Sequence, residues 1–253
     1  MFRFCLADTR RSLTVWWFLF AGLIYIVSSW PYLIAAKLYN LNITEFYLIS
    51  FSNQYYFLLI LFPLLFLYLL RLNWTPSISI LSRGENFSSY IWARFVTLSL
   101  SLLVILLFHV LITFLMGIGL HDSAETRMFG YAYFDAILPL FEKQFHLPLI
   151  AVFLLLLNYL LGLICISSIV GFILVYFPRN IKIAALVVLY FTIFFGVQRS
   201  ATWNLSALFI SNYILLSNAI TANLFPASIL LMIGIVFSTF FILWKRWWKA
   251  KSW

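Results

Sequence analysis

The sequence predicts an all-α polytopic membrane protein. Composition, the length of the apolar runs and their continuity lead to that prediction. Of the 253 residues, 65% are apolar and 9% are charged, whereas a soluble domain carries roughly 25% charged residues. Apolar runs of about 20 residues recur along the chain, enough for a helix to cross a hydrocarbon core about 30 Å thick. A membrane barrel would instead alternate apolar and polar residues in segments of about 10 residues. We therefore expect a single transmembrane domain, 1–253, built as a helical bundle.

Six runs are long enough to span the membrane, and the charges between them set their orientation, because Lys and Arg are retained on the cytoplasmic side. With both termini cytoplasmic, twelve of the sixteen basic residues fall inside and five of the seven acidic residues fall outside. Anionic lipid attracts basic residues, so we assign the net charge of +9 to the inner membrane surface and expect no nucleic-acid partner. The predicted transmembrane helices are Leu13–Ala36, Phe46–Leu70, Tyr90–Leu120, Leu147–Phe177, Ile181–Val197 and Ala227–Trp244.

Three segments outside these spans have a pattern of their own. Residues 1–12 place aromatic residues and arginines on opposite sides, which predicts an amphipathic helix lying along the inner surface. Residues 75–89 form a polar cytoplasmic segment between the second and third spans. Residues 121–147 form a long outer loop rich in aromatic and acidic residues, which we interpret as an interfacial cap.

The stretch Trp203–Phe225 is apolar enough to be considered as a seventh span, but its amide and hydroxyl groups argue against that. Exposed polar groups of this density are not tolerated by a helix that faces lipid. A seventh span would also move the basic C-terminal cluster to the outside. We expect residues 198–226 to form an outer re-entrant or interfacial hairpin, whose polar residues are Asn204, Ser206, Ser211, Asn212, Ser217, Asn218, Thr221 and Asn223.

Motifs of catalysis are missing from the sequence. It contains no Gly-x4-Gly-Lys-Ser/Thr and no His-Glu-x-x-His, the patterns that cradle nucleotide phosphates or hold a catalytic zinc. The two cysteines, Cys5 and Cys165, lie at different depths and suggest neither a disulfide nor a metal. We therefore predict no enzyme, no metal site and no cofactor within this chain.

Polar residues inside the spans are the candidates for a substrate pathway, because such groups are costly in lipid and often functional. Each also has a purely structural interpretation. A histidine or an amide can hydrogen-bond a neighbouring helix, and a serine can allow two helices to pack closely. Both interpretations stay open for the five candidates, which are Ser28, Asn53, Gln54, His109 and Asn158.

The predicted spans contain no acidic residue. A transporter that couples to protons or sodium ions normally needs an intramembrane carboxylate or a broken helix. With no nucleotide motif either, an exporter of this sequence would take its energy from another subunit. Residues 75–89, on the cytoplasmic side, are the segment that such a subunit could contact.

Within residues 75–89, local signals predict a short helix. Thr75 can serve as its N-cap with Pro76 at the first helical position, and Gly84 can end it. The alternative is a plain loop.

The order of elements resembles that of the permease subunits of type-2 ABC exporters, in particular the bacterial permeases of peptide-antibiotic export and immunity systems. The resemblance covers the whole chain at the level of layout. The polar hairpin is similar in position to that family's external helices, and the 121–147 loop is a departure from its pattern. The residues in the position of the family's coupling helix are Ser82, Arg83, Gly84 and Glu85, followed by Tyr90 and Arg94.

The resemblance implies a mechanism and a set of partners. Two permease chains, identical or sister, would pair through spans one and five around a pathway. Two separate ATPase subunits, which bind ATP and Mg²⁺, would grip the coupling helices from below and rock the bundles. Arg83 and Glu85 would contact the ATPase groove. The cargo would be hydrophobic or amphipathic: a peptide, a lipid or a drug moved out of a bacterial cell.

Two alternatives from other classes remain open. The chain could be a stand-alone membrane binding protein, such as an immunity factor that sequesters a toxin without turnover. It could also be an integral-membrane enzyme that acts on lipid through a site with no recognisable motif. A neighbouring ATPase gene would favour the exporter over both.

Overall fold

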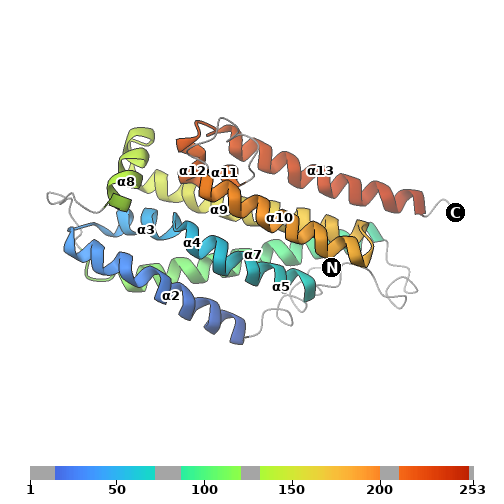
Figure 1. The fold of residues 1–253 in the computed structure, drawn as a ribbon, viewed down its shortest axis with the longest axis horizontal. Helices are drawn as coiled ribbons and strands as arrows, with labels where there is room; N and C mark the ends of the chain where they lie inside the picture. The colour runs from blue at the N-terminus through green and yellow to red at the C-terminus, as the bar shows by residue number, and fades with distance from the viewer. Residues whose placement is uncertain (1–14, 72–86, 121–131, 200–210, 251–253) are drawn as a thin grey trace.

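The described residues form an all-helical bundle without strands (Figure 1). The structure, a computed structural model, describes residues 15–71, 87–120, 132–199 and 211–250. Side chains are described for residues 20–69, 92–120, 135–178, 181–195 and 212–242. The predicted interfacial helix at 1–12 lies outside the described residues, as do residues 75–86 of the predicted coupling segment.

Four helical stretches are long and apolar enough to cross a membrane. They are Phe20–Leu38, Ile43–Leu69, Trp92–Gly117 and Pro148–Tyr176. Two shorter apolar stretches, Ile181–Phe195 and Ala227–Ile242, belong to helices that are themselves longer. The long helices are α2 (Val15–Leu38), α7 (Phe87–Gly117), α9 (Pro148–Tyr176), α10 (Arg179–Arg199) and α13 (Ala227–Ala250).

The second predicted span is not one helix, although its sequence is apolar throughout. It is divided into α3 (Ile43–Phe51), α4 (Gln54–Tyr56), the π-helix η1 (Phe57–Leu61) and α5 (Phe62–Arg71). Asn42 and Glu45 form a capping box at the start of α3, with reciprocal backbone bonds of 2.9 and 2.8 Å. The sequence predicted where this apolar helical segment lies, but it did not predict the internal break.

Helix α9 is the centre of the bundle, because it packs against α3, α5, α7, α8, α10, α11, α12 and α13. Its buried face includes small residues such as Gly162, Ser167 and Ser168, which let neighbouring backbones come close. Pro148 occupies the first turn and the chain leaves in extended conformation at Phe177, ahead of Pro178. Proline fits the first turn but cannot continue a helix interior.

Contacts between helix ends define two ends of the bundle. At the α8 end, α8 (Ala132–Gln144) packs on α3, α9 and α12 (Leu216–Thr221). At the opposite end, which we call the α5 end, the hydroxyl of Tyr176 in α9 donates to the Ile242 carbonyl of α13 at 3.0 Å. Trp92 of α7 also stacks edge-on against Phe240 there. Figure 1 shows the long helices running between these ends.

The predicted outer loop 121–147 contains a helix. α8 occupies residues 132–144, and its side chains Leu138 and Phe141 are buried. Phe145, just after α8, lies edge-on to Phe225 with ring centroids 5.6 Å apart. This part of the loop therefore packs on the chain that precedes α13.

Candidate functional site at the break in the second span

The break between α3 and α4 is built by Asn53. Its side-chain oxygen accepts hydrogen bonds from the backbone N–H groups of Tyr55 and Tyr56, both at 3.1 Å. This satisfies donors that the first turn of a new helix leaves free. The N–H of Ser52 still bonds back to Leu48 and Ile49 at 3.2 Å. The hydrogen-bond ladders of α3 and α4 therefore end and begin at neighbouring residues, deep in an apolar span.

Below the break the backbone widens into the π-helix, which ends just before Pro63. Phe62 N–H bonds to the carbonyl of Phe57, five residues back. The next residue in that register, Pro63, has no N–H to offer the carbonyl of Leu58. The hydroxyl of Tyr190 from α10 donates to this Leu58 carbonyl at 3.4 Å. Single π-turns in proteins are frequently found at functional sites.

A buried polar cluster lies beside the break and joins α2, α4 and α7. The Tyr56 hydroxyl is 2.6 Å from Nε2 of His109. Thr113 donates its hydroxyl hydrogen to the His109 carbonyl at 2.9 Å, so it accepts from the Tyr25 hydroxyl 2.7 Å away. The Tyr25 ring packs on the His109 ring with centroids 4.6 Å apart. The histidine is therefore held by a tyrosine on each of two other helices.

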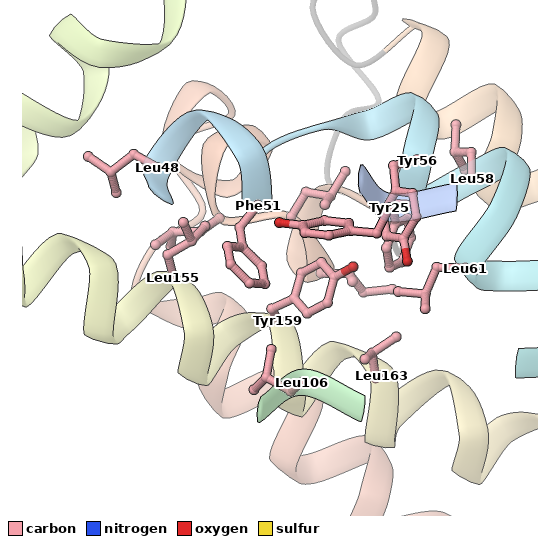
Figure 2. Packing of buried hydrophobic residues seen from close by; sticks show 14 of the residues in the cluster. Tyr25, Leu48, Phe51, Tyr56, Leu58, Leu61, Leu106, Leu155, Tyr159 and Leu163 are labelled. Carbon is pink, nitrogen blue, oxygen red and sulfur yellow. The ribbon is translucent and has the colours of Figure 1, made fainter. Parts of the chain in front are cut away.

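Figure 2 shows the aromatic packing around this cluster. Tyr159 of α9 lies edge-on to Phe51, before the break, and to Phe57, after it, with centroid distances of 5.7 and 5.8 Å. Tyr25 and Tyr56 meet edge-on at 4.9 Å. Such edge-on pairs contribute about 0.5–1.5 kcal/mol each beyond area burial. These aromatic rings therefore pack between the break at Ser52–Asn53 and α9.

The second span is also bonded to residues 211–221, the described part of the predicted hairpin, which we call the hairpin region. Gln54, the first residue after the break, donates from Nε2 to Oδ1 of Asn218 in α12 at 2.8 Å. Asn158 of α9 donates from Nδ2 to the carbonyls of Ile214 and Tyr213 at 2.6 and 3.2 Å. A hydrogen bond from a side-chain amide to a neighbouring membrane helix contributes about 0.6–2 kcal/mol.

The hairpin region reaches the middle of α9. Its described helices are α11 (Ser211–Ile214) and α12, separated by Leu215 in extended conformation. A Cβ added at Gly162 would lie 2.5 Å from Cγ2 of Ile214. Gly162 is the central residue of α9, about 21 Å along the axis from Pro148. Asn212, Ser217 and Asn218 are at most 5% exposed, so these polar side chains face protein and not lipid.

Several polar atoms of this region have no hydrogen-bond partner among the described residues. They include Oδ1 of Asn158, Nδ2 of Asn218 and Oγ of Ser217. An unsatisfied buried polar group costs about 1–3 kcal/mol.

The structure brings four of the five predicted pathway residues to this region. Asn53, Gln54, His109 and Asn158 belong to the break, the cluster beside it and the hairpin contacts. Ser28 is separate, because its hydroxyl donates to the Tyr25 carbonyl of its own helix at 2.9 Å. All five have hydrogen-bond partners within the chain, and their role in a pathway stays a prediction.

Most of the predicted coupling contact lies beyond what the structure describes. This applies to Ser82, Arg83, Gly84 and Glu85. Tyr90 is in the first turn of α7, and its side chain is not described. Arg94 is one turn further along α7 and only 7% exposed, so its guanidinium lies within the bundle.

A small cavity of about 50 Å³ lies at the α8 end, between α3, α8 and the start of α9. Its wall is mainly apolar and also carries Asn42, Glu45 and Glu142. In the part of the chain that is described, no three His, Cys, Asp or Glu side chains gather in a group that could hold a metal ion.

The tyrosines of the site were not predicted from the sequence. Tyr25, Tyr56, Tyr159 and Tyr190 each lie near the middle of an apolar run, where a phenol hydroxyl needs a partner when buried. Their position in apolar runs could therefore have identified them as candidates. No feature of the sequence predicts that Gln54 pairs with Asn218, because 164 residues separate them in the chain.

Comparison of the chain with protein-family models, with curated proteins and with solved structures returned no match.

Proposed function

We propose that this chain is the transmembrane permease subunit of an ATP-binding-cassette exporter. In this proposal the chain crosses the membrane six times, with α10 and α13 as the fifth and sixth spans. The α5 end faces the cytoplasm and the α8 end faces outward. A separate ATPase supplies the energy, and the cargo is a hydrophobic or amphipathic molecule.

The observation that carries the proposal is the polar hairpin region docked against the middle of α9. Ile214 packs at Gly162 and its carbonyl is bonded by Asn158, while α12 returns to α8 at the bundle's end. In the proposal α11 lies at mid-depth and α12 returns toward the outer surface, and re-entrant backbone of this kind is tolerated where protein covers it. The type-2 exporter permeases, which this chain resembles in layout, have external helices at the same place before the last span. An apolar composition alone does not account for such a polar segment.

The broken second span supports the same function. Broken helices at mid-depth recur in transporters, where they form sites and allow rearrangement. Here α5 leads directly into residues 75–89, the predicted cytoplasmic contact. An ATPase gripping Arg83 and Glu85 would therefore act on the half of the span that lies after the break. Arg94, buried in α7, would hold the other flank of that segment in the bundle.

The partner permease chain, a second copy or a sister chain, would cover α2 and α10. Their outward faces are apolar and leave large side chains exposed, among them Trp30 at 53% and Phe195 at 54%. Pairing there would place the pathway between two chains, with the polar hairpin of each near its outer exit.

Co-purification with a candidate ABC ATPase tests the proposal. We expect a stable complex that hydrolyses ATP, and we expect R83A/E85A to lose most transport-coupled hydrolysis while the bundle stays folded. The matched control is D8A/R10A, which removes one acid and one base from another inner segment without effect. Normal coupled turnover by R83A/E85A would overturn the assigned contact. Failure of any ATPase to bind would instead favour the stand-alone binding protein.

A further inference from the structure

The irregular stretch of the second span is bonded to the α10–α12 region at two points. Gln54 binds Asn218 of α12, and the Leu58 carbonyl accepts from Tyr190 of α10. The stretch is therefore placed between the half-span that ends at Arg71 and the hairpin near the other end of the bundle.

The break interrupts the backbone hydrogen bonds between the two halves of the second span. Asn53 N–H reaches only the Ser50 carbonyl, at 3.4 Å, while Phe57 N–H bonds to the Asn53 carbonyl at 3.2 Å. From Asn53 onward, α4, η1 and α5 follow one another without interruption. A helix is stiff along its axis, so a shift or turn of α5 arrives at Gln54. The two unwound residues absorb it before α3, as hinge residues do.

The hairpin region is divided in the same way. Asn158 of α9 holds the carbonyls of Tyr213 and Ile214 in α11. Leu215, with φ −89° and ψ 115°, separates α11 from α12. α12 can therefore change position while α11 stays fixed on α9, and the side chain that links α12 to the second span is Asn218.

We infer that the Gln54–Asn218 hydrogen bond couples α4 to α12, so that a displacement of α4 about Ser52–Asn53 also displaces α12 about Leu215. Nδ2 of Asn218 and Oγ of Ser217 have no hydrogen-bond partner among the described residues, which is consistent with a second position of α12 in which these atoms are bonded. This coupling is a property of the single chain and does not depend on the proposed ATPase.

Distances between spin labels test this coupling in the full chain, with Cys5→Ser and Cys165→Ala as background. One label replaces Thr221 at the end of α12. The other replaces Ile118, which is 61% exposed and follows Gly117, whose neighbours are Ile43 and Phe46 of α3. S52A/N53A removes the cap and favours a continuous helix through the break, which displaces α4 relative to α3.

The expected result is a shift of the label distance in S52A/N53A, and loss of at least half of that shift when Asn218→Ala is added. L59A is the matched control, because Leu59 lies in the same stretch and is 54% exposed; it should leave the distance unchanged. An equal shift with and without Asn218, or no shift at all, overturns the inference.

A second variant covers the case in which S52A/N53A fails to fold. Gln54→Leu removes the link from the other side without touching the cap. Gln54→Leu and Asn218→Ala should change the label distance alike, and the two together should add nothing further. Unchanged distances in both single variants, or additive effects in the pair, would refute the coupling.

Discussion

The close approach of Gly162 to Ile214 gives a stability prediction with a worked magnitude. In Gly162→Ala the new Cβ would lie 2.5 Å from Cγ2, 3.1 Å from Cβ and 3.3 Å from Cα of Ile214. Carbon atoms prefer about 3.5–4.0 Å, so Cγ2 must retreat by about 1 Å. Because the Cα is also too close, rotation of the side chain is insufficient and α11 itself must move.

Three terms contribute to the change in the free energy of unfolding caused by Gly162→Ala. Overpacking costs about 1–3 kcal/mol. Displacing α11 also weakens the 2.6 Å bond from Asn158 to the Ile214 carbonyl, at about 0.6 kcal/mol. Replacing a helical glycine by alanine returns about 0.5–1 kcal/mol. We expect a net loss of about 0.6–3 kcal/mol in the free energy of unfolding.

Reversible unfolding in mixed detergent micelles measures this difference. Gly234→Ala is the control, because a Cβ at Gly234 of α13 meets no atom within 4 Å and should stabilise slightly. Ile214→Ala creates space for the new methyl group, so its combination with Gly162→Ala should be more stable than the sum of the single effects. If Gly162→Ala is as stable as Gly234→Ala, or if the pair is additive, the docking of Ile214 on α9 is not as described.

Two further predictions concern the buried polar bonds. Tyr56→Phe leaves the ring nitrogen of His109 without its 2.6 Å partner and should cost about 1–3 kcal/mol in the same unfolding assay. Tyr55→Phe, at a side chain 63% exposed, should change stability by less than about 0.5 kcal/mol; equal effects of the two would argue against the bond. Asn158→Leu removes the donor to two hairpin carbonyls and should speed amide hydrogen exchange in residues 211–221 about fivefold to tenfold, since a factor of ten corresponds to about 1.4 kcal/mol. Unchanged exchange would show that packing alone holds the hairpin region.

The starts and lengths of helices could be predicted where residues close together in the chain determine them. The predicted start at Ala227 coincides with that of α13, and the predicted start at Leu147 lies one residue before α9, where Pro148 occupies the first turn. Continuous apolar runs set the length of a helix in lipid. These features depend on residues close together in the chain, so one sequence is enough to place them.

The candidate site could be predicted only in part. Asn53, Gln54, His109 and Asn158 stand out because polar groups in apolar runs are rare. The break at Ser52–Asn53 does not stand out, because Phe46–Leu70 remains apolar on both sides of it. An asparagine can cap a helix or bond to a neighbour, and only the packing of α9, α7 and the hairpin region decides which.

The pairing of the hairpin with the rest of the bundle was beyond sequence reasoning for a different reason. The amides of residues 198–226 predict that a helix there would not face lipid, and in the described part of that stretch Asn212, Ser217 and Asn218 are at most 5% exposed. Which groups they would meet depends on Gly162 allowing α11 to approach α9, and a glycine at mid-helix has several possible roles. Long-range contacts of this kind are set by the fold as a whole.

The most direct test of a permease driven by a separate motor is the distance between labels at Thr221 and Ile118 in the complex with the ATPase. ATP and Mg²⁺ would be added to an ATPase variant that binds but does not hydrolyse. We predict that the nucleotide shifts this distance in the wild-type chain and that R83A/E85A abolishes the shift while the complex still forms. A complex that binds ATP yet leaves the distance unchanged would contradict the proposed transmission from the cytoplasmic segment to the outer hairpin.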